Sequence, residues 1–118
     1  MAYRLTTILL SLMWISTACA QSNLPPFVAK LITHFESAPL GASPDAVWRY
    51  RYKDASVYYL PRLACCDIMS RLYDASGKLI CHPDGGVAGG GDGKCSDFIA
   101  KRKDGEQLWS DPRAKLRQ

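Results

Sequence analysis

Four cysteines and one histidine are the residues of this chain whose types and spacing could do chemistry. Cys65 and Cys66 are neighbours, Cys81 is followed directly by His82, and Cys95 completes the set. Four thiols and an imidazole could hold zinc in a tetrahedral site, but structural zinc sites usually contain a Cys-x2-4-Cys pair, which this chain lacks. An even number of cysteines in a small domain instead favours a disulfide framework. We therefore expect two disulfide bonds, no metal site and no cofactor.

The pairing of these cysteines is open among three connectivities. A bond between Cys65 and Cys66 would close a small strained ring, so each of them is expected to pair with a distant partner, Cys81 or Cys95. Neighbouring side chains on an extended backbone point to opposite faces, which suits two separate bridges. Each bridge would close a loop of roughly 15 to 30 residues and contribute about 3 kcal/mol in the chain-entropy model.

A glycine-rich segment over 83–93 contains the candidate binding residues Asp84, Gly85, Gly86 and Asp92. Six of its eleven positions are glycine, which excludes a helix or a regular strand. The two aspartates and the glycine carbonyls could form a calcium loop, although calcium needs six to eight oxygen ligands and the EF-hand spacing is absent. The segment could also be a protease-inhibitor loop or a purely structural connection.

A row of aromatic residues forms the second candidate binding surface. Residues 47–52 alternate strictly, so that Trp48, Tyr50 and Tyr52 share one face of a predicted strand. This face has two interpretations: it packs as a core beneath the N-terminal helix, or it is an exposed platform for a ligand or partner. Tyrosine and tryptophan suit both environments, because each has a polar group at the end of an apolar ring.

The sequence patterns around these residues predict an α+β fold. We expect a small disulfide-stabilised domain with an N-terminal helix packed on antiparallel β-hairpins and a short C-terminal helix. Apolar side chains at helical spacing and flanking prolines predict the first helix. Alternating segments with turn residues between them predict the hairpins, and Gly77 supplies a positive φ for the second turn. In chain order we expect a helix over 26–37, a hairpin with strands over 47–52 and 57–60 and a turn over 53–56, a second hairpin over 68–81, a helix over 97–103 and a strand over 107–109.

The charge pattern argues against nucleic acid as a partner. The chain has 15 Lys and Arg against 11 Asp and Glu, and without Arg4 the remaining 14 basic residues give a net charge of +3. Apart from the triplet over 101–103, the basic residues are scattered among acidic ones, so no phosphate-binding stripe is evident. We expect the triplet to lie in the last turn of the short helix, where the helix dipole favours cations. Ser96 and Asp97 are expected to cap the start of this helix, and Gly105 fits the position after its end.

The first twenty residues are typical of a secretory signal peptide. Arg4 precedes an apolar run over 5–15, and Ala-Cys-Ala at 18–20 matches a signal-peptidase site. The run is too short for a transmembrane helix, which needs about 20 apolar residues. Cleavage after Ala20 predicts a secreted or periplasmic protein, whereas lipidation at Cys19 predicts an outer-membrane lipoprotein. We expect the rest of the chain, residues 21–118, to form one small domain with its core at about 45–111, whose oligomeric state the sequence does not indicate.

Three motifs follow one another in this core: Cys-Cys-Asp at 65–67, Pro-Asp-Gly-Gly at 83–86 and Gly-Asp-Gly-Lys-Cys at 91–95. In this combination the segment resembles a family of small bacterial exported or lipoprotein domains of unknown function. The resemblance implies an extracytoplasmic bacterial domain. It brings no activity, substrate or catalytic residue with it.

The expected function is that of a binding domain rather than an enzyme. The chain contains neither Gly-x-Ser-x-Gly nor His-Glu-x-x-His, and paired cysteines offer no thiolate nucleophile. We expect it to contact an unknown protein or small ligand outside the cytoplasm through the aromatic hairpin, the glycine-rich segment or both. A second hypothesis is an inhibitor of an exported protease or lysozyme, and a third is a calcium-binding module.

The signal sequence makes a prediction that intact-mass spectrometry can check. The exported protein is expected to lack residues 1–20, because the Ala-Cys-Ala site places cleavage after Ala20. A chain that keeps Met1 in the exported fraction contradicts this cleavage. A diacylglycerol mass on Cys19 shows that the chain is processed as a lipoprotein.

Overall fold

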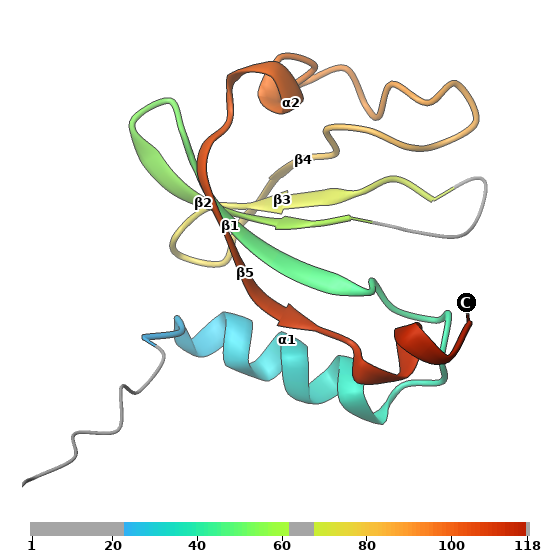
Figure 1. Cartoon of the computed structure of the whole chain (residues 1–118). Helices are drawn as coiled ribbons and strands as arrows, with labels where there is room; N and C mark the ends of the chain where they lie inside the picture. Colours follow the sequence, from blue (N-terminus) through green and yellow to red (C-terminus); the bar gives the residue numbers. More distant parts are fainter. Residues whose placement is uncertain (1–22, 62–67, 118) are drawn as a thin grey trace, which may run out of the picture.

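A five-stranded antiparallel sheet forms the centre of the computed structural model, which describes residues 23–61 and 68–117 (Figure 1). The strands lie in the order β4-β3-β2-β1-β5, so four consecutive strands form a meander and β5 crosses to pair with β1. One helix, α1, packs on one face of the sheet, and α2 lies on the other. In chain order the elements are α1 (Pro26–Ser37), β1 (Ala46–Tyr52), β2 (Ala55–Leu60), β3 (Arg71–Tyr73), β4 (Leu79–Cys81), α2 (Phe98–Lys101), β5 (Lys103–Ser110) and the 3-10 helix η1 (Pro112–Arg117).

This arrangement agrees with the expected α+β class, with a helix packed on antiparallel hairpins. The signal peptide over 1–20 with its Cys19, and also Cys65 and Cys66, lie outside the described residues. Among the residues that are described, no helix combines the length and the apolar character needed to cross a membrane.

The bounds of α1 confirm the helix predicted over 26–37. Its first residue is a proline, whose fixed φ suits the first helical turn and whose missing N–H removes no intrahelical bond. Val28 and Phe35 on the apolar face are buried. The helix ends because Ala38 adopts an extended conformation with ψ 154°, as expected for a residue that precedes a proline.

The β1–β2 hairpin turns on only two residues. Lys53 and Asp54 have positive φ angles of 49° and 60°, which is typical of the type I′ turn that matches the twist of the flanking strands. Tyr52 therefore lies directly opposite Ala55 in the strand register. The turn predicted over 53–56 is too long, because β2 already begins at Ala55.

The second hairpin, formed by β3 and β4, is confirmed, and so is the positive φ of Gly77, at 88°. The carboxylate of Asp74 organises this turn, since its Oδ1 accepts hydrogen bonds from the N–H groups of Ser76 and Lys78 at 2.9 and 3.0 Å and from the Ser76 hydroxyl at 2.6 Å. These bonds, the hydroxyl of Ser76 first, lower the pKa of Asp74. A side chain at Gly77 would also press against the ring of Phe27, 2.9 Å from the position of its Cβ.

The C-terminal half of the domain differs from the sequence prediction. The short helix was predicted over 97–103 and the last strand over 107–109, but α2 ends at Lys101 and β5 begins at Lys103. Arg102 between them is extended, with ψ 143°. The longer strand forms because β5 pairs with β1 over most of its length, and such tertiary pairing overrides a weak local helix preference.

Gly105 lies inside β5 and does not follow the end of the helix, as the sequence had suggested. Asp104 before it has a positive φ of 52°, and the register with β1 is irregular nearby. A Cβ atom at Gly105 would lie 2.5 Å from the ring of Tyr50. The glycine is therefore required because an aromatic ring covers this point of the strand.

The sheet buries a separate apolar cluster on each face. The α1-side core contains Val28, Phe35, Val47, Tyr58 and Leu60. The α2-side core contains Tyr52, Val57, Tyr59, Leu72, Cys81, Cys95 and Phe98. Both cores draw on β1 and β2, so these two strands are the centre of the domain.

The aromatic row of Trp48, Tyr50 and Tyr52 belongs to the α2 side of the sheet. The interpretation that placed this row beneath the N-terminal helix is therefore wrong. Alternation along a strand predicts that two faces differ, but it does not say which face a helix covers. Here α1 covers the face that carries Val47.

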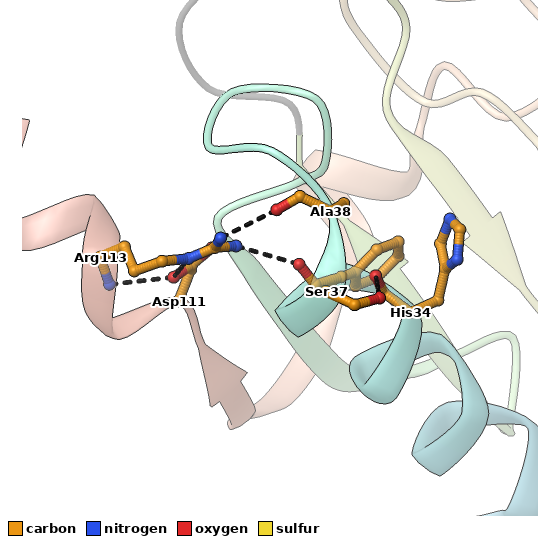
Figure 2. Close-up of polar contacts among 6 residues, drawn as sticks. His34, Ser37, Ala38, Asp111 and Arg113 are labelled. Carbon is orange, nitrogen blue, oxygen red and sulfur yellow. Dashed lines mark hydrogen bonds and ion pairs between the residues drawn. The ribbon is translucent and has the colours of Figure 1, made fainter.

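Arg113 in η1 ties the end of α1 to the residues that follow β5 (Figure 2). Its guanidinium donates to the carbonyl oxygens of Ala38 and Phe35 at 2.8 and 3.0 Å. The same group binds both carboxylate oxygens of Asp111, at 3.0 Å from Nε and 2.8 Å from Nη2. The last carbonyls of a helix lack intrahelical N–H partners, and Arg113 supplies donors for them.

This clamp predicts that Arg113→Ala lowers the melting temperature by about 5 °C, because the buried carboxylate of Asp111 and the end of α1 lose their shared partner. Lys115→Ala, on the same 3-10 helix but exposed, is the matched control and should leave the melting temperature unchanged. Thermal melting followed by circular dichroism measures both. Equal melting temperatures for the two variants contradict the clamp.

Candidate functional site

A disulfide between Cys81 and Cys95 closes the glycine-rich segment. Their Cα atoms are 6.2 Å apart, and both residues are buried on the α2 side of the sheet. The expectation that each of them pairs with Cys65 or Cys66 is wrong. The last residue of β4 and the residues before α2 meet on the same face of the sheet, and this proximity of backbone segments cannot be deduced from cysteine spacing.

Asp84 is tied to the sheet through both its backbone and its side chain. Ser70, only 1% exposed, donates to the Asp84 carbonyl from its N–H at 3.0 Å and from its hydroxyl at 3.2 Å, and the Asp84 N–H donates back to that hydroxyl at 3.1 Å. The Asp84 carboxylate accepts a hydrogen bond from the hydroxyl of Tyr59 at 2.8 Å. Burial, together with this bond, raises the pKa of Tyr59. Asp84 therefore anchors the segment to β2.

Gly85, Gly86 and Gly91 allow the backbone to turn in conformations that other residues disfavour. All three have positive φ, between 67° and 84°. A Cβ at Gly91 would lie 1.9 Å from the carbonyl oxygen of His82, and one at Gly85 would lie 2.7 Å from the carbonyl oxygen of Ile68. The candidate binding residues Gly85 and Gly86 are thus part of a tightly folded connection.

Asp92 bonds to its own turn. Its Oδ1 accepts the N–H of Lys94 at 3.0 Å, and this bond is the main cause that lowers the pKa of Asp92. Within the described ranges, no three His, Cys, Asp or Glu side chains gather where they could hold a metal ion.

Ser70, His82 and Asp84 lie close together without forming a catalytic relay. His82 Nδ1 contacts the backbone carbonyl of Ser70 at 2.7 Å, whereas the Ser70 hydroxyl bonds to the backbone of Asp84. A nucleophilic serine needs a base on its hydroxyl and a third group that orients the base. These contacts instead join β3 to the strand that leads into the glycine-rich segment.

The inner end of the aromatic row is fixed by Asp97 and Phe98. Tyr52 is buried and donates from its hydroxyl to Asp97 Oδ1 at 2.5 Å. Burial and this bond raise the pKa of Tyr52, and the bond lowers the pKa of Asp97. Asp97 occupies the predicted N-cap position of α2, but its side chain makes no cap bond to the helix. Phe98, fully buried, packs against the ring of Tyr52 with the centroids 5.3 Å apart.

The outer end of the row is partly exposed and holds Trp48 and Tyr50. Their rings are stacked, with centroids 5.9 Å apart and an angle of 18° between the planes. The guanidinium of Arg102 lies 4.7 Å from the centroid of the Tyr50 ring and 5.7 Å from that of Tyr59, within the range of cation–π contacts. Two aromatic rings and one cation thus form a preorganised surface on the α2 side.

Sequence reasoning missed Arg102 and Phe98 as parts of this site. Both lie within the helix that the sequence predicts over 97–103, where the helix dipole would account for the positive charge of Arg102. For Phe98 the sequence did contain a signal, namely an aromatic side chain that could pack against the three aromatic residues of β1. No comparable signal existed for Arg102, because its position depends on where α2 ends.

A family model described as a domain of unknown function (DUF6970) matches residues 33–111. These residues include every strand of the sheet, the glycine-rich segment and α2. No curated protein and no solved structure matches the chain.

The glycine-rich segment makes a prediction that separates tight packing from an open binding loop. Gly91→Ala should strongly destabilise the domain or unfold it, because its Cβ would overlap the backbone of His82 and its φ of 67° disfavours a side chain. Gly90→Ala is the matched control next to it, since its Cβ meets nothing within 4 Å. Thermal melts of both variants test this, and similar stabilities would show that the connection is loosely packed.

Proposed function

Because the chain belongs to the DUF6970 family of domains of unknown function, we propose its function from its own surface: it is an exported, non-enzymatic binding domain. Its contact surface is the stacked pair Trp48 and Tyr50 with Arg102 beside it. The partner is an unknown protein or small ligand outside the cytoplasm, and the partly exposed ring stack is the observation that carries the proposal.

The stack suits binding because it is rigid before a partner arrives. Tyr50 packs edge-on against Phe98 at 5.7 Å between centroids, and Arg102 lies over Tyr50. Trp48 stacks on this supported ring. Aromatic side chains held in place lose little conformational entropy on binding, and they supply a large apolar area with polar ends.

A binding role rather than catalysis is supported by the way the polar groups are used. Ser70 is buried and bonded to backbone, and the carboxylates of Asp84 and Asp97 each accept a tyrosine hydroxyl. Through these bonds the three side chains connect the sheet to the glycine-rich segment and to α2. The sheet, with its supporting contacts, is then a scaffold for the exposed rings.

Export is supported by the signal-like segment over 1–20 and by the buried bond between Cys81 and Cys95, since disulfides are typical of oxidising compartments. The resemblance of the motifs to small bacterial exported or lipoprotein domains points the same way. We propose a secreted or periplasmic location after cleavage at Ala20. Lipidation of Cys19, which would anchor the domain to the outer membrane, is the alternative.

A specific feature favours a second candidate function, inhibition of an exported protease or lysozyme. Val87 in the glycine-rich segment is 90% exposed, although the segment is closed by a disulfide and fixed to the sheet at Asp84. An apolar side chain presented on a restrained loop resembles the way in which inhibitors offer a residue to an enzyme cleft. In that case the partner contacts Val87 rather than Trp48.

Capture from periplasmic or secreted extract distinguishes these two surfaces. We expect immobilised wild-type protein and Val87→Ser to retain the same partner, whereas Trp48→Ala weakens capture by at least about tenfold, as for an aromatic hot spot. Thermal melting confirms that each variant remains folded. Loss of capture with Val87→Ser alone supports the inhibitor function, and equal capture by all three proteins contradicts both surfaces.

A further inference from the structure

A basic cavity lies where the β1–β2 turn meets the junction of α2 and β5. Figure 1 shows the backbone of these two segments. Its volume of about 460 Å³ is within the range of small-molecule sites, about 300–1,000 Å³. Five basic residues line it from two parts of the chain: Arg51 and Lys53 come from the hairpin, and Lys101, Arg102 and Lys103 come from the junction. One acidic residue, Asp54 of the turn, lines it as well. The cavity thus gathers cations that are about fifty positions apart in sequence.

The two strands at this cavity place like charges opposite each other. Arg51 on β1 is the register partner of Lys103 on β5, an arrangement that destabilises a sheet. Farther along the same strands Arg49 lies opposite Glu106 and forms an ion pair with it. Within the described part of the chain no ion pair joins Arg51 or Lys103 to a carboxylate, although Asp54 also lines the cavity.

The other cations are held in place around the cavity. Arg102 is fixed by its contact with the Tyr50 ring. Lys53 lies 5.1 Å from the centroid of the Tyr52 ring. Lys101 makes an exposed ion pair with Asp97 at 3.5 Å, which is worth little in water. The helix dipole, which was expected to account for the basic triplet, does not account for Lys103, because that residue belongs to β5.

We propose that this basic cavity binds the phosphate group of a small phosphate ester. Arg51 and Arg102 both line the cavity, and a guanidinium group is a planar donor fork that matches the oxygens of a phosphate. A phosphate dianion neutralises more of the charge at Lys103 and its neighbours than a single carboxylate does. Tyr52 and Ala100 also line the cavity, and the organic part of the ester would lie next to them.

This site differs from the proposed contact surface, because neither Trp48 nor Tyr50 lines the cavity. The two share Arg102, which lies between them. Trp48→Ala should therefore leave phosphate-ester binding unchanged. Failure of the partner-capture experiment leaves this inference standing. Failure of phosphate-ester binding likewise leaves the proposed contact surface standing.

Isothermal titration of the mature protein with glycerol 3-phosphate tests the site, in buffer of about 0.15 M ionic strength, where distant charges are screened. We expect binding at one site, weakened about tenfold by Arg51→Gln and by Lys103→Gln. Without ligand, both variants should melt at or above the wild-type temperature, since each relieves a like-charge pair. Arg49→Gln removes the same charge from the same strand outside the cavity, and it should lower the melting temperature while leaving the affinity unchanged.

Two sources of the phosphate group are distinguished by sedimentation with vesicles of phosphatidylglycerol or phosphatidylcholine. Binding to phosphatidylglycerol vesicles that glycerol 3-phosphate reverses identifies a lipid headgroup as the source, and binding of the soluble ester alone identifies a free ester. The inference is overturned if neither probe binds, if citrate binds and glycerol 3-phosphate does not, or if Arg49→Gln weakens binding as much as Arg51→Gln.

Discussion

The burial of Phe98 is the interaction on which the α2 side of the domain depends. Its side chain has no exposed surface, and the rings of Tyr50, Tyr52 and Tyr59 surround it at centroid distances of 5.7, 5.3 and 5.2 Å. A helix of four residues, such as α2, is too short to be stable in isolation, so its position comes from this packing and from the neighbouring disulfide. The position of α2 in turn fixes the positions of Arg102 and of the start of β5, because both follow α2 directly in the chain.

The elements that could be predicted from the sequence are those whose signals are local. Prolines on both sides of an apolar helical stripe mark α1, alternation marks β1, and Gly77 marks the turn of the second hairpin. Each of these signals acts within a few residues, where backbone sterics and side-chain period decide the structure. Their agreement with the structure is therefore physically expected.

The parts that could not be predicted depend on which segments meet across the fold. The pairing of Cys81 with Cys95, the start of β5 at Lys103 and the face occupied by Trp48 are all set by the crossing of the chain from β4 to the far edge of the sheet. Residue type alone marked Trp48 and Tyr50 as candidates for a surface, and in the structure their stacked rings are partly exposed. It also marked Asp84 and Asp92 as candidate binding residues. Their carboxylates instead bond within the domain, to a tyrosine of the sheet and to a backbone N–H of the loop.

The contact between Arg113 and the end of α1 bears on the order in which the domain matures during synthesis. The arginine bonds to carbonyls 75 and 78 positions earlier in the chain, and the edge strand that precedes it pairs with β1. A ribosome releases α1 well before it releases either of these partners. The contacts that hold the end of the first helix can therefore form only after nearly the whole sheet has been made, whereas its packing on β1 and β2 depends on segments made earlier.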